Sequence, residues 1–254
     1  MIIDSHVHIT ENGKWFNSNI DASLGRLMRE MDEAEVDKAV LLALPDYIPN
    51  EFIYKVCREY PDQFMGAGGI NPNQPDCLNE MEKCFYKYEF RVLKLHPRYN
   101  NFIPLGINTL KVLEKAEKFG VTVIFDGYVQ SDTLLLSDLQ PLVYDVIAKK
   151  FPDLKLIIAH MGYPKLIDAY TVAKSNKNIY LDLSYILPDL YENEMLSSVY
   201  LSLRKLDRKV LYGSDFPEVG LFEYKKFFFQ VASNTPDEKL KNVLYHNAKQ
   251  ILGF

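Results

Sequence analysis

Short apolar runs alternate with longer amphipathic stretches along the whole chain. Each run is nearly continuous in apolar residues, which is typical of parallel strands buried on both faces. The runs predict eight strands, at residues 1–7, 38–44, 64–70, 91–96, 121–126, 155–160, 179–184 and 209–215. Eight strands with helices between them favour a (β/α)8 TIM barrel of the α/β class, formed by residues 1–254 as a single domain.

The stretches between the runs carry apolar residues at helical spacing. Leu24, Leu27 and Met31 follow the i, i+3, i+7 pattern of one helix face. In a later helix, Asn108 is the expected N-cap and Gly120 the expected stop. A doubly wound open sheet is the alternative fold, but no glycine-rich fingerprint follows the first strand. The pattern therefore favours the barrel.

Composition and charge exclude several classes of protein. Hydrophobic residues make up 48% of the 254 residues and charged residues 25%, as in an ordinary globular protein. The formal net charge of −5 argues against a nucleic-acid-binding role. No apolar run is long enough to span a bilayer, and the chain does not start with a signal peptide. We therefore expect a cytoplasmic protein without a membrane partner.

Two of the five histidines, His6 and His8, lie two positions apart in the first predicted strand. Residues i and i+2 of a strand point to the same face, so both imidazoles project together. Imidazole is the commonest side-chain metal ligand, and the pair therefore raises the hypothesis of metal-assisted catalysis. The alternative is that the two histidines are chance neighbours on a solvated strand.

Other polar residues interrupt the apolar runs at the ends of the predicted strands. Barrel active sites lie at the C-terminal ends of the strands, so side chains at these positions converge on one mouth. The residues at strand ends are His6, His8, Lys94, His96, Asp126, His160 and Asp215. They include four of the five histidines of the chain, which favours a functional site over a chance distribution.

Five motifs in a fixed order complete this picture. They are Asp4-Ser5-His6-Val7-His8, Lys94-Leu95-His96-Pro97, Ala159-His160-Met161-Gly162, Gly213-Ser214-Asp215-Phe216-Pro217 and Asn247-Ala248-Lys249-Gln250-Ile251-Leu252-Gly253. The ordered set resembles the amidohydrolase-related metal-dependent hydrolases, in the branch with aminocarboxymuconate-semialdehyde decarboxylase and related decarboxylases and lactonases. The motifs span the chain from end to end, and the resemblance implies a distorted (β/α)8 barrel.

The resemblance also implies roles for individual residues. His6 and His8 would bind a divalent metal ion, and Asp215 would be a further ligand or the base that takes a proton from the attacking water. His160 would orient or polarise the water or the substrate. The chain departs from the family at Asp126, where metal-binding members usually carry histidine. The family also includes lactonases that work without a metal.

A site formed by His6, His8, Asp126 and Asp215 would offer two imidazoles and two carboxylates, which together neutralise a dication. A carboxylate can bind Zn²⁺ or Mn²⁺, so Asp126 keeps this ligand set chemically sound. Zinc is preferred on ligand type, and manganese suits the extra carboxylate. If Asp215 is not a ligand, it can act as a general base. The structural alternatives are a helix N-cap for Asp215 and a wall-bonded imidazole for His160.

Five residues are expected to bind a small-molecule substrate: Trp15, Lys94, His96, Arg98 and Tyr128. Arg98 is a candidate clamp for a substrate carboxylate, because guanidinium binds this group bidentately, or else a solvated surface side chain. Lys94 is expected to hold a substrate carboxylate or to form a buried pair with Asp126; a carbamylated lysine, as in binuclear relatives, is the alternative. Trp15 lies in the long first loop, which has the length of a lid.

Three functions remain open at this point. The first is metal-dependent hydrolysis of an amide, ester or lactone, and the second is non-oxidative decarboxylation of an unsaturated or aromatic acid with the same metal. The third is a catalytically inactive barrel with a binding role. The aromatic run at residues 227–229 leaves room for a homodimer.

Overall fold

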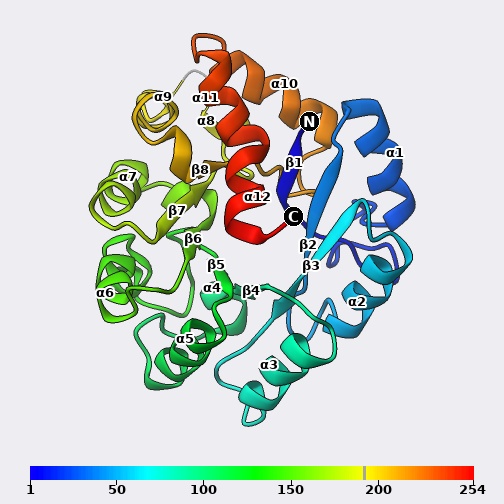
Figure 1. Ribbon diagram of the computed structural model, residues 1–254, viewed down its shortest axis with the longest axis vertical. Helices are drawn as coiled ribbons and strands as arrows, with labels where there is room; N and C mark the ends of the chain where they lie inside the picture. The colour runs from blue at the N-terminus through cyan, green and yellow to red at the C-terminus, as the bar shows by residue number, and fades with distance from the viewer. Residues whose placement is uncertain (191–192) are drawn as a thin grey trace.

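Eight parallel strands form one continuous sheet, in which each strand pairs with the next one along the chain. The computed structural model describes residues 1–190 and 193–254, and Figure 1 shows the strands as a ring surrounded by helices. The strands are β1 (Ile3–Val7), β2 (Lys38–Leu42), β3 (Phe64–Gly69), β4 (Val92–Leu95), β5 (Thr122–Phe125), β6 (Leu156–Ile158), β7 (Ile179–Asp182) and β8 (Val210–Leu211). The predicted barrel is therefore confirmed.

The helices follow the strands and cover the outside of the barrel. The α-helices are α1 (Leu24–Ala34), α2 (Asn50–Glu59), α3 (Cys77–Tyr86), α4 (Pro97–Asn100), α5 (Ile107–Phe119), α6 (Leu142–Lys150), α7 (Leu166–Ser175), α8 (Leu187–Leu190), α9 (Leu196–Lys205), α10 (Leu221–Val231), α11 (Asp237–Lys241) and α12 (Asn247–Leu252). Short 3-10 or π turns are η1 (Leu136–Leu139), η2 (Ala159–Gly162), η3 (Asp207–Lys209) and η4 (Asn242–His246).

The ends of the helices agree with the sequence only in part. In α1, the predicted apolar face buries Leu27 and Met31 against the barrel. In α5, Gly120 adopts the left-handed conformation and ends the helix, as predicted. The N-cap is Gly106 and not Asn108. Gly106 has an extended backbone, and the helix begins at the next residue, Ile107, one position before the expected cap.

The floor of the barrel is closed by the last helix. Apolar residues of the strands point inward and pack against Ala248, Ile251 and Leu252 of α12. Figure 1 shows α12, in red, across the middle of the ring of strands. The Thr122 hydroxyl, at the start of β5, donates a hydrogen bond to the Ile251 carbonyl at 2.7 Å. Since α12 meets the N-terminal ends of the strands, the open side of the barrel is the opposite end.

The seam between β8 and β1 is the irregular part of the barrel. β8 has only two residues, and β1 meets the segment after β8 through an isolated bridge between Val7 and Phe216. Instead of a regular ladder, the seam has single backbone contacts: His8 N–H donates to Phe216 O at 2.7 Å, and Asp215 N–H donates to His6 O at 2.9 Å. The seam brings the start and the end of the chain side by side and accounts for the distortion.

Two further expectations concern the outer surface. No helix within residues 1–190 and 193–254 is long and apolar enough to cross a bilayer. The aromatic run at residues 227–229 is not a continuous exposed surface, because Phe228 is fully buried and its ring lies 5.1 Å from that of Tyr212. The expected exposure of this run is therefore wrong for Phe228. The homodimer itself stays a prediction.

Candidate active site

A cavity of about 540 Å³ opens at the C-terminal ends of the strands. Of the predicted site residues, all but Asp126 line it: His6, His8, Trp15, Lys94, His96, Arg98, Tyr128, His160 and Asp215. The structure therefore brings together side chains that are as far apart in sequence as residues 6 and 215. Asp126 is buried behind the cavity wall.

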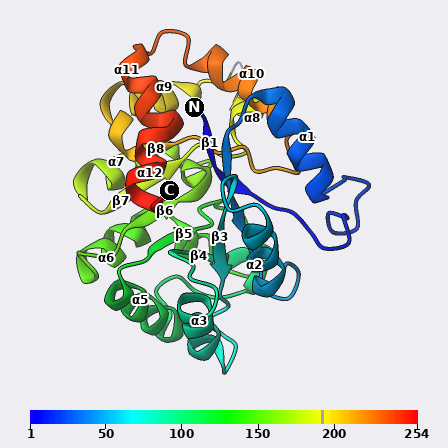
Figure 2. The ribbon, with the colours of Figure 1, turned by 45° about the vertical axis from the view of Figure 1, so that its right-hand side comes forward.

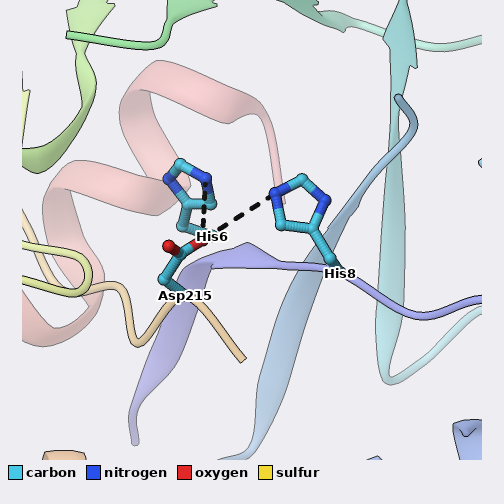
Figure 3. Close-up of side chains that lie close together, drawn as sticks. All are labelled: His6, His8 and Asp215. Atoms are coloured by element: carbon cyan, nitrogen blue, oxygen red, sulfur yellow. Dashed lines mark ion pairs between the residues drawn. The ribbon is translucent and has the colours of Figure 1, made fainter. Parts of the chain in front are cut away.

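His6, His8 and Asp215 converge at the seam between β1 and β8 (Figure 3). Asp215 Oδ1 lies 3.3 Å from His6 Nε2 and 3.8 Å from His8 Nε2. Neighbouring ligand atoms of a tetrahedral zinc ion lie about 3.3 Å apart, given bonds of about 2.0–2.1 Å. The spacing of these three donors therefore fits one divalent ion.

The outer nitrogens of the two histidines are fixed by acceptors. His6 Nδ1 lies 3.0 Å from Asp182 Oδ2, and His8 Nδ1 lies 3.0 Å from Leu42 O. Carboxylate and carbonyl oxygens only accept hydrogen bonds, so each Nδ1 carries a hydrogen and each Nε2 keeps its lone pair. Burial lowers the pKa of both histidines, which keeps them neutral. Neutral imidazoles with free Nε2 lone pairs are what a metal ion requires.

Lys94 occupies the space beside this pair. Its side chain is buried, and Nζ lies 3.0 Å from His6 Nε2. Burial lowers the pKa of Lys94, whereas the carboxylates of Asp126 and Asp215 act against that shift. Lys94 therefore donates to the lone pair that a metal ion bound to His6 would use.

Asp126 is committed to a different set of partners. Its carboxylate accepts two hydrogen bonds from Arg98, at 2.7 Å from Nε and 2.8 Å from Nη2, and lies 3.3 Å from His160 Nε2. Burial raises the pKa of Asp126, but His96, Arg98 and His160 hold it well below its usual range. Among the described residues, Asp126 belongs to neither group of side chains that could share an ion. The structure therefore separates Asp126 from His6, His8 and Asp215.

Arg98 and its neighbours form the opposite wall of the cavity. The two guanidinium nitrogens that would clamp a substrate carboxylate are already bonded to Asp126. The guanidinium also lies 4.8 Å from the centre of the Tyr128 ring. His96 caps α4 by accepting from Tyr99 N–H at 3.2 Å, and burial lowers its pKa to about 3. This wall is therefore paired within itself before any substrate binds.

His160 points both ring nitrogens at acceptors. Nδ1 lies 3.1 Å from Ser184 O, and Nε2 faces Asp126 Oδ1 at 3.3 Å. Burial lowers the pKa of His160, but the hydrogen bond to Asp126 and the charge of Asp215 raise it above its usual value overall. The imidazole is therefore held in its protonated form, with the chemistry of an acid.

Two residues that the sequence analysis missed lie beneath these histidines. Asp182, at the end of β7, is fully buried and contacts His6 Nδ1 and the backbone N–H of His160. Ser184 donates its hydroxyl hydrogen to Asp182 at 2.5 Å. The alternation in Leu181-Asp182-Leu183-Ser184 places two polar residues on one face of an otherwise apolar strand, which is the signal that could have identified them.

The first loop covers the side of the cavity on which His8 lies. Figure 2 shows it reaching out from the barrel between β1 and α1. The Trp15 ring lies 5.5 Å from that of His8, and its Nε1–H donates to Glu218 Oε1 at 2.5 Å. Phe16 stacks on Tyr47 with ring centres 4.2 Å apart. The loop is therefore attached to the segments that follow β2 and β8, as a closed lid would be.

The comparisons with known proteins agree with this architecture. The sequence matches the family model described as amidohydrolase over residues 3–254. None of the curated protein sequences matches the chain.

Solved structures share the fold over nearly the whole length. An uncharacterized TIM-barrel protein from Bordetella bronchiseptica is 19% identical, with 99% of this chain and 98% of that chain covered and a TM-score of 0.86. A probable 2-pyrone-4,6-dicarboxylic acid hydrolase from Acinetobacter baumannii, with citric acid bound, is 15% identical (100% and 99% covered, TM-score 0.74). The 5-carboxyvanillate decarboxylase from Sphingomonas paucimobilis is 15% identical (99% and 98% covered, TM-score 0.73). At these identities the likeness shows the fold.

Proposed function

The chain belongs to the amidohydrolase family, and from this premise we propose that it is a metal-dependent hydrolase of a small organic molecule. The bond it cleaves is an amide, ester or lactone. The observation that carries the proposal is the convergence of His6 Nε2, His8 Nε2 and Asp215 Oδ1 within 4.8 Å of one another. Three protein donors beside an open cavity leave a coordination position for water, as catalytic zinc sites do.

The donor set favours Zn²⁺ and also admits Mn²⁺, because two imidazoles and one carboxylate suit both ions. A bound ion would lower the pKa of a water molecule towards neutrality and polarise the substrate carbonyl. In this proposal Asp126 is not a ligand. Its two bonds to Arg98 satisfy both carboxylate oxygens and support a structural role in the opposite wall.

Asp215 and His160 divide the proton transfers between them. Asp215 is more exposed than Asp126 and Asp182, and its Oδ2 makes no hydrogen bond to a described residue. It is therefore free to take a proton from the attacking water. His160, protonated and at the edge of the same cavity, gives a proton to the leaving oxygen or nitrogen.

The substrate is a small molecule, and the charges of the cavity favour one that carries a carboxylate. Lys94 Nζ has a single hydrogen-bond partner among the described residues, so two of its three donors are unused. Tyr128 and Tyr185 add hydroxyl groups and aromatic surface to the same cavity. Citric acid bound to the hydrolase-like structure from Acinetobacter baumannii is consistent with a cavity of this type accepting carboxylates.

Decarboxylation is the second candidate, supported by one observation. Loss of CO₂ requires a proton donor for the carbon that is left, and His160 is held as an imidazolium beside the cavity. The similarity of fold to a 5-carboxyvanillate decarboxylase supports the same alternative. The two reactions would use the same ion and the same acid.

The test combines metal analysis with two substrate panels. Protein purified without chelator is analysed for bound metal, and is then assayed with lactones, esters and amides and, separately, with carboxylic acids under CO₂ detection. Asp215→Asn is the matched control. Hydrolysis without CO₂ release that is lost in Asp215→Asn supports the proposal, and CO₂ release supports the second candidate. If no ion is bound and added Zn²⁺ or Mn²⁺ produces no activity on either panel, both metal-dependent candidates fail.

A further inference from the structure

Asp182 connects the two histidines that carry different parts of the site. Its Oδ2 lies 3.0 Å from His6 Nδ1. Its Oδ1 accepts from the backbone N–H of His160 at 2.9 Å, from the backbone N–H of Ser184 at 3.0 Å and from the Ser184 hydroxyl at 2.5 Å. The carboxylate is fully buried, and all of its partners are donors. One oxygen thus serves His6, and the other serves His160 and Ser184.

The contact with His6 determines which ring nitrogen carries the hydrogen. A carboxylate can only accept, so Nδ1 must donate to it. The Ser184 hydroxyl also lies 3.0 Å from His6 Nδ1, but it gives its own hydrogen to Asp182 and is left as a second acceptor. Nε2 of His6 is therefore the nitrogen without hydrogen, on the side of Asp215.

The contact with His160 supports an unusual backbone. His160 and Met161 have φ angles of 56° and 48°, in the left-handed region. For residues other than glycine this conformation is strained, because Cβ lies too close to the following carbonyl oxygen. The bond from the His160 N–H to Asp182 Oδ1 and that from Nδ1 to Ser184 O hold the turn in place. The imidazole of His160 is thereby aimed at the cavity and at Asp126.

We propose that Asp182 is the positioning residue of the site, which fixes the tautomer of His6 for metal binding and the orientation of His160 for proton transfer. The part that concerns the ion rests on the proposed function, whereas the tautomer of His6 does not. Partners of this kind typically change metal affinity 10–100-fold when they are removed. The backbone carbonyl of Ser184 assists by accepting from His160 Nδ1, a contact that does not depend on the serine side chain.

Asp182→Asn tests the proposal without removing the support for His160. The asparagine keeps its carbonyl oxygen towards the three donors and turns its NH₂ group towards His6 Nδ1, so two donors meet there. We expect His6 to move towards the tautomer with hydrogen on Nε2, and Zn²⁺ affinity to fall 10–100-fold. Ser184→Ala is the matched control, because it leaves Asp182 in place; its Zn²⁺ affinity is expected to stay within about threefold of the wild type. Asp182→Asn/Ser184→Ala removes both acceptors and is expected to lose at least as much as Asp182→Asn.

Two readouts distinguish the outcomes. ¹⁵N chemical shifts of the histidine rings, measured on chelator-treated protein and assigned with His6→Gln, report the tautomer without any metal; equilibrium dialysis against Zn²⁺ reports affinity. The proposal is overturned if wild-type His6 carries its hydrogen on Nε2, or if Asp182→Asn keeps both the wild-type tautomer and the wild-type affinity. If the variant does not fold, the tautomer of wild-type His6 still decides. If the wild type binds no Zn²⁺, the proposed function fails together with the part that concerns the ion, while the tautomer still tests the contact between Asp182 and His6.

Discussion

The two walls of the cavity use their charged groups in opposite ways. On the wall formed by β1 and the segment after β8, His6 and His8 keep lone pairs that point towards Asp215. On the wall formed by the ends of β4 and β5, Arg98 and Asp126 are bonded to each other through two hydrogen bonds. On the first wall, Lys94 is the one cation that contacts these residues in the part of the chain that the structure describes, through His6, whereas on the second wall an arginine and a carboxylate neutralise each other.

Under the proposed function, the first wall holds the groups that react with the substrate, and the second wall holds groups that only keep the cavity in shape. A buried charge is stabilised by an opposite charge that is hydrogen-bonded to it, and such a pair holds the neighbouring side chains in position. The lone pairs of the neighbouring imidazoles face the position that an external cation would take, and at His6 such a cation would compete with Lys94. Lys94 stands between the walls, and its ammonium group bonds to His6 Nε2. The same residue types thus serve two purposes, depending on whether the fold provides their partner.

The largest expected effect comes from removing the carboxylate of the first wall. Asp215→Asn should reduce Zn²⁺ affinity more than 100-fold, beyond the range seen for partners that only orient a ligand. Asp126→Asn should leave Zn²⁺ affinity within about threefold of the wild type, because Asp126 is bonded to Arg98 and not to the ion. Equilibrium dialysis of the two variants measures both. Equal losses in the two variants would remove the distinction between the walls.

The second effect concerns the stability of the opposite wall. Arg98→Ala leaves Asp126 buried without its bidentate partner, and breaking a buried pair costs about 3–5 kcal/mol. Arg98 is 27% exposed and His160 still faces Asp126, so we expect a loss of about 2–3 kcal/mol in the free energy of unfolding. Urea denaturation measures it.

Arg98→Met/Asp126→Leu provides the control for this prediction. The double variant removes both charges and should be more stable than Arg98→Ala, because no uncompensated carboxylate is left. A double variant no more stable than Arg98→Ala would show that the two charges make no mutual contribution to the free energy of unfolding.

The third effect is a pH dependence that belongs to the same wall. His96 has a pKa of about 3 in the folded protein because of burial, whereas in the unfolded chain it is about 6.5. The unfolded state therefore takes up a proton first, and stability is lost as the pH falls below about 6.5. His96→Asn keeps an N-cap acceptor and lacks this titration. Between pH 7 and pH 5 the wild type should lose about 2 kcal/mol more than the variant.

The control for this prediction is the comparison above neutral pH. From pH 7 to pH 8 both proteins have a neutral side chain at position 96, so the difference between their unfolding free energies should stay constant. Below pH 7, the unfolding free energy of the wild type should fall more steeply than that of His96→Asn. Equal slopes would show that His96 takes up a proton in the folded state.

The smallest effect concerns the lid on the side of the first wall. Trp15→Phe keeps the ring beside His8 and removes the donor that bonds to Glu218. Hydrogen bonds to charged groups contribute about 1.5–3 kcal/mol when buried, and less in a loop that can open. We expect KM to rise about fivefold, or about 1 kcal/mol, with kcat within twofold. Glu218→Gln keeps a carbonyl acceptor for the Trp15 N–H and should raise KM less; a fall in kcat alone would assign Trp15 to the chemistry instead of to closure.

The barrel and most of the cavity lining could be predicted because both follow from local patterns. Apolar runs predict buried parallel strands, and the rule that barrel sites lie at the C-terminal ends of strands identifies His6, His160 and Asp215 together. The pairing of Asp126 with Arg98 needed one more step. The register of β4 and β5 sets Leu95 opposite Phe125, so the side chains just beyond these residues face each other.

The remaining features depend on contacts that no local pattern records. The bonds from Asp182 to His6 and to His160 span 176 and 22 residues, and the left-handed backbone of His160 follows from the turn of η2, not from residue type. The irregular seam likewise reflects the two-residue length of β8 and the isolated bridge between Val7 and Phe216, which no local pattern records. Long-range hydrogen bonding decides these details, whereas alternation and spacing decide the elements.

The seam has one consequence for how the protein is made. His6 is synthesised long before Asp215, yet both lie at the junction where the ring of strands is least regularly hydrogen-bonded. A ribosome-bound fragment that ends before β8 has the two histidines but lacks the carboxylate and the strand that brings it close. An ion retained with full affinity would therefore mark a chain in which the segment after β8 has joined β1, and losing it would loosen the molecule first at that junction.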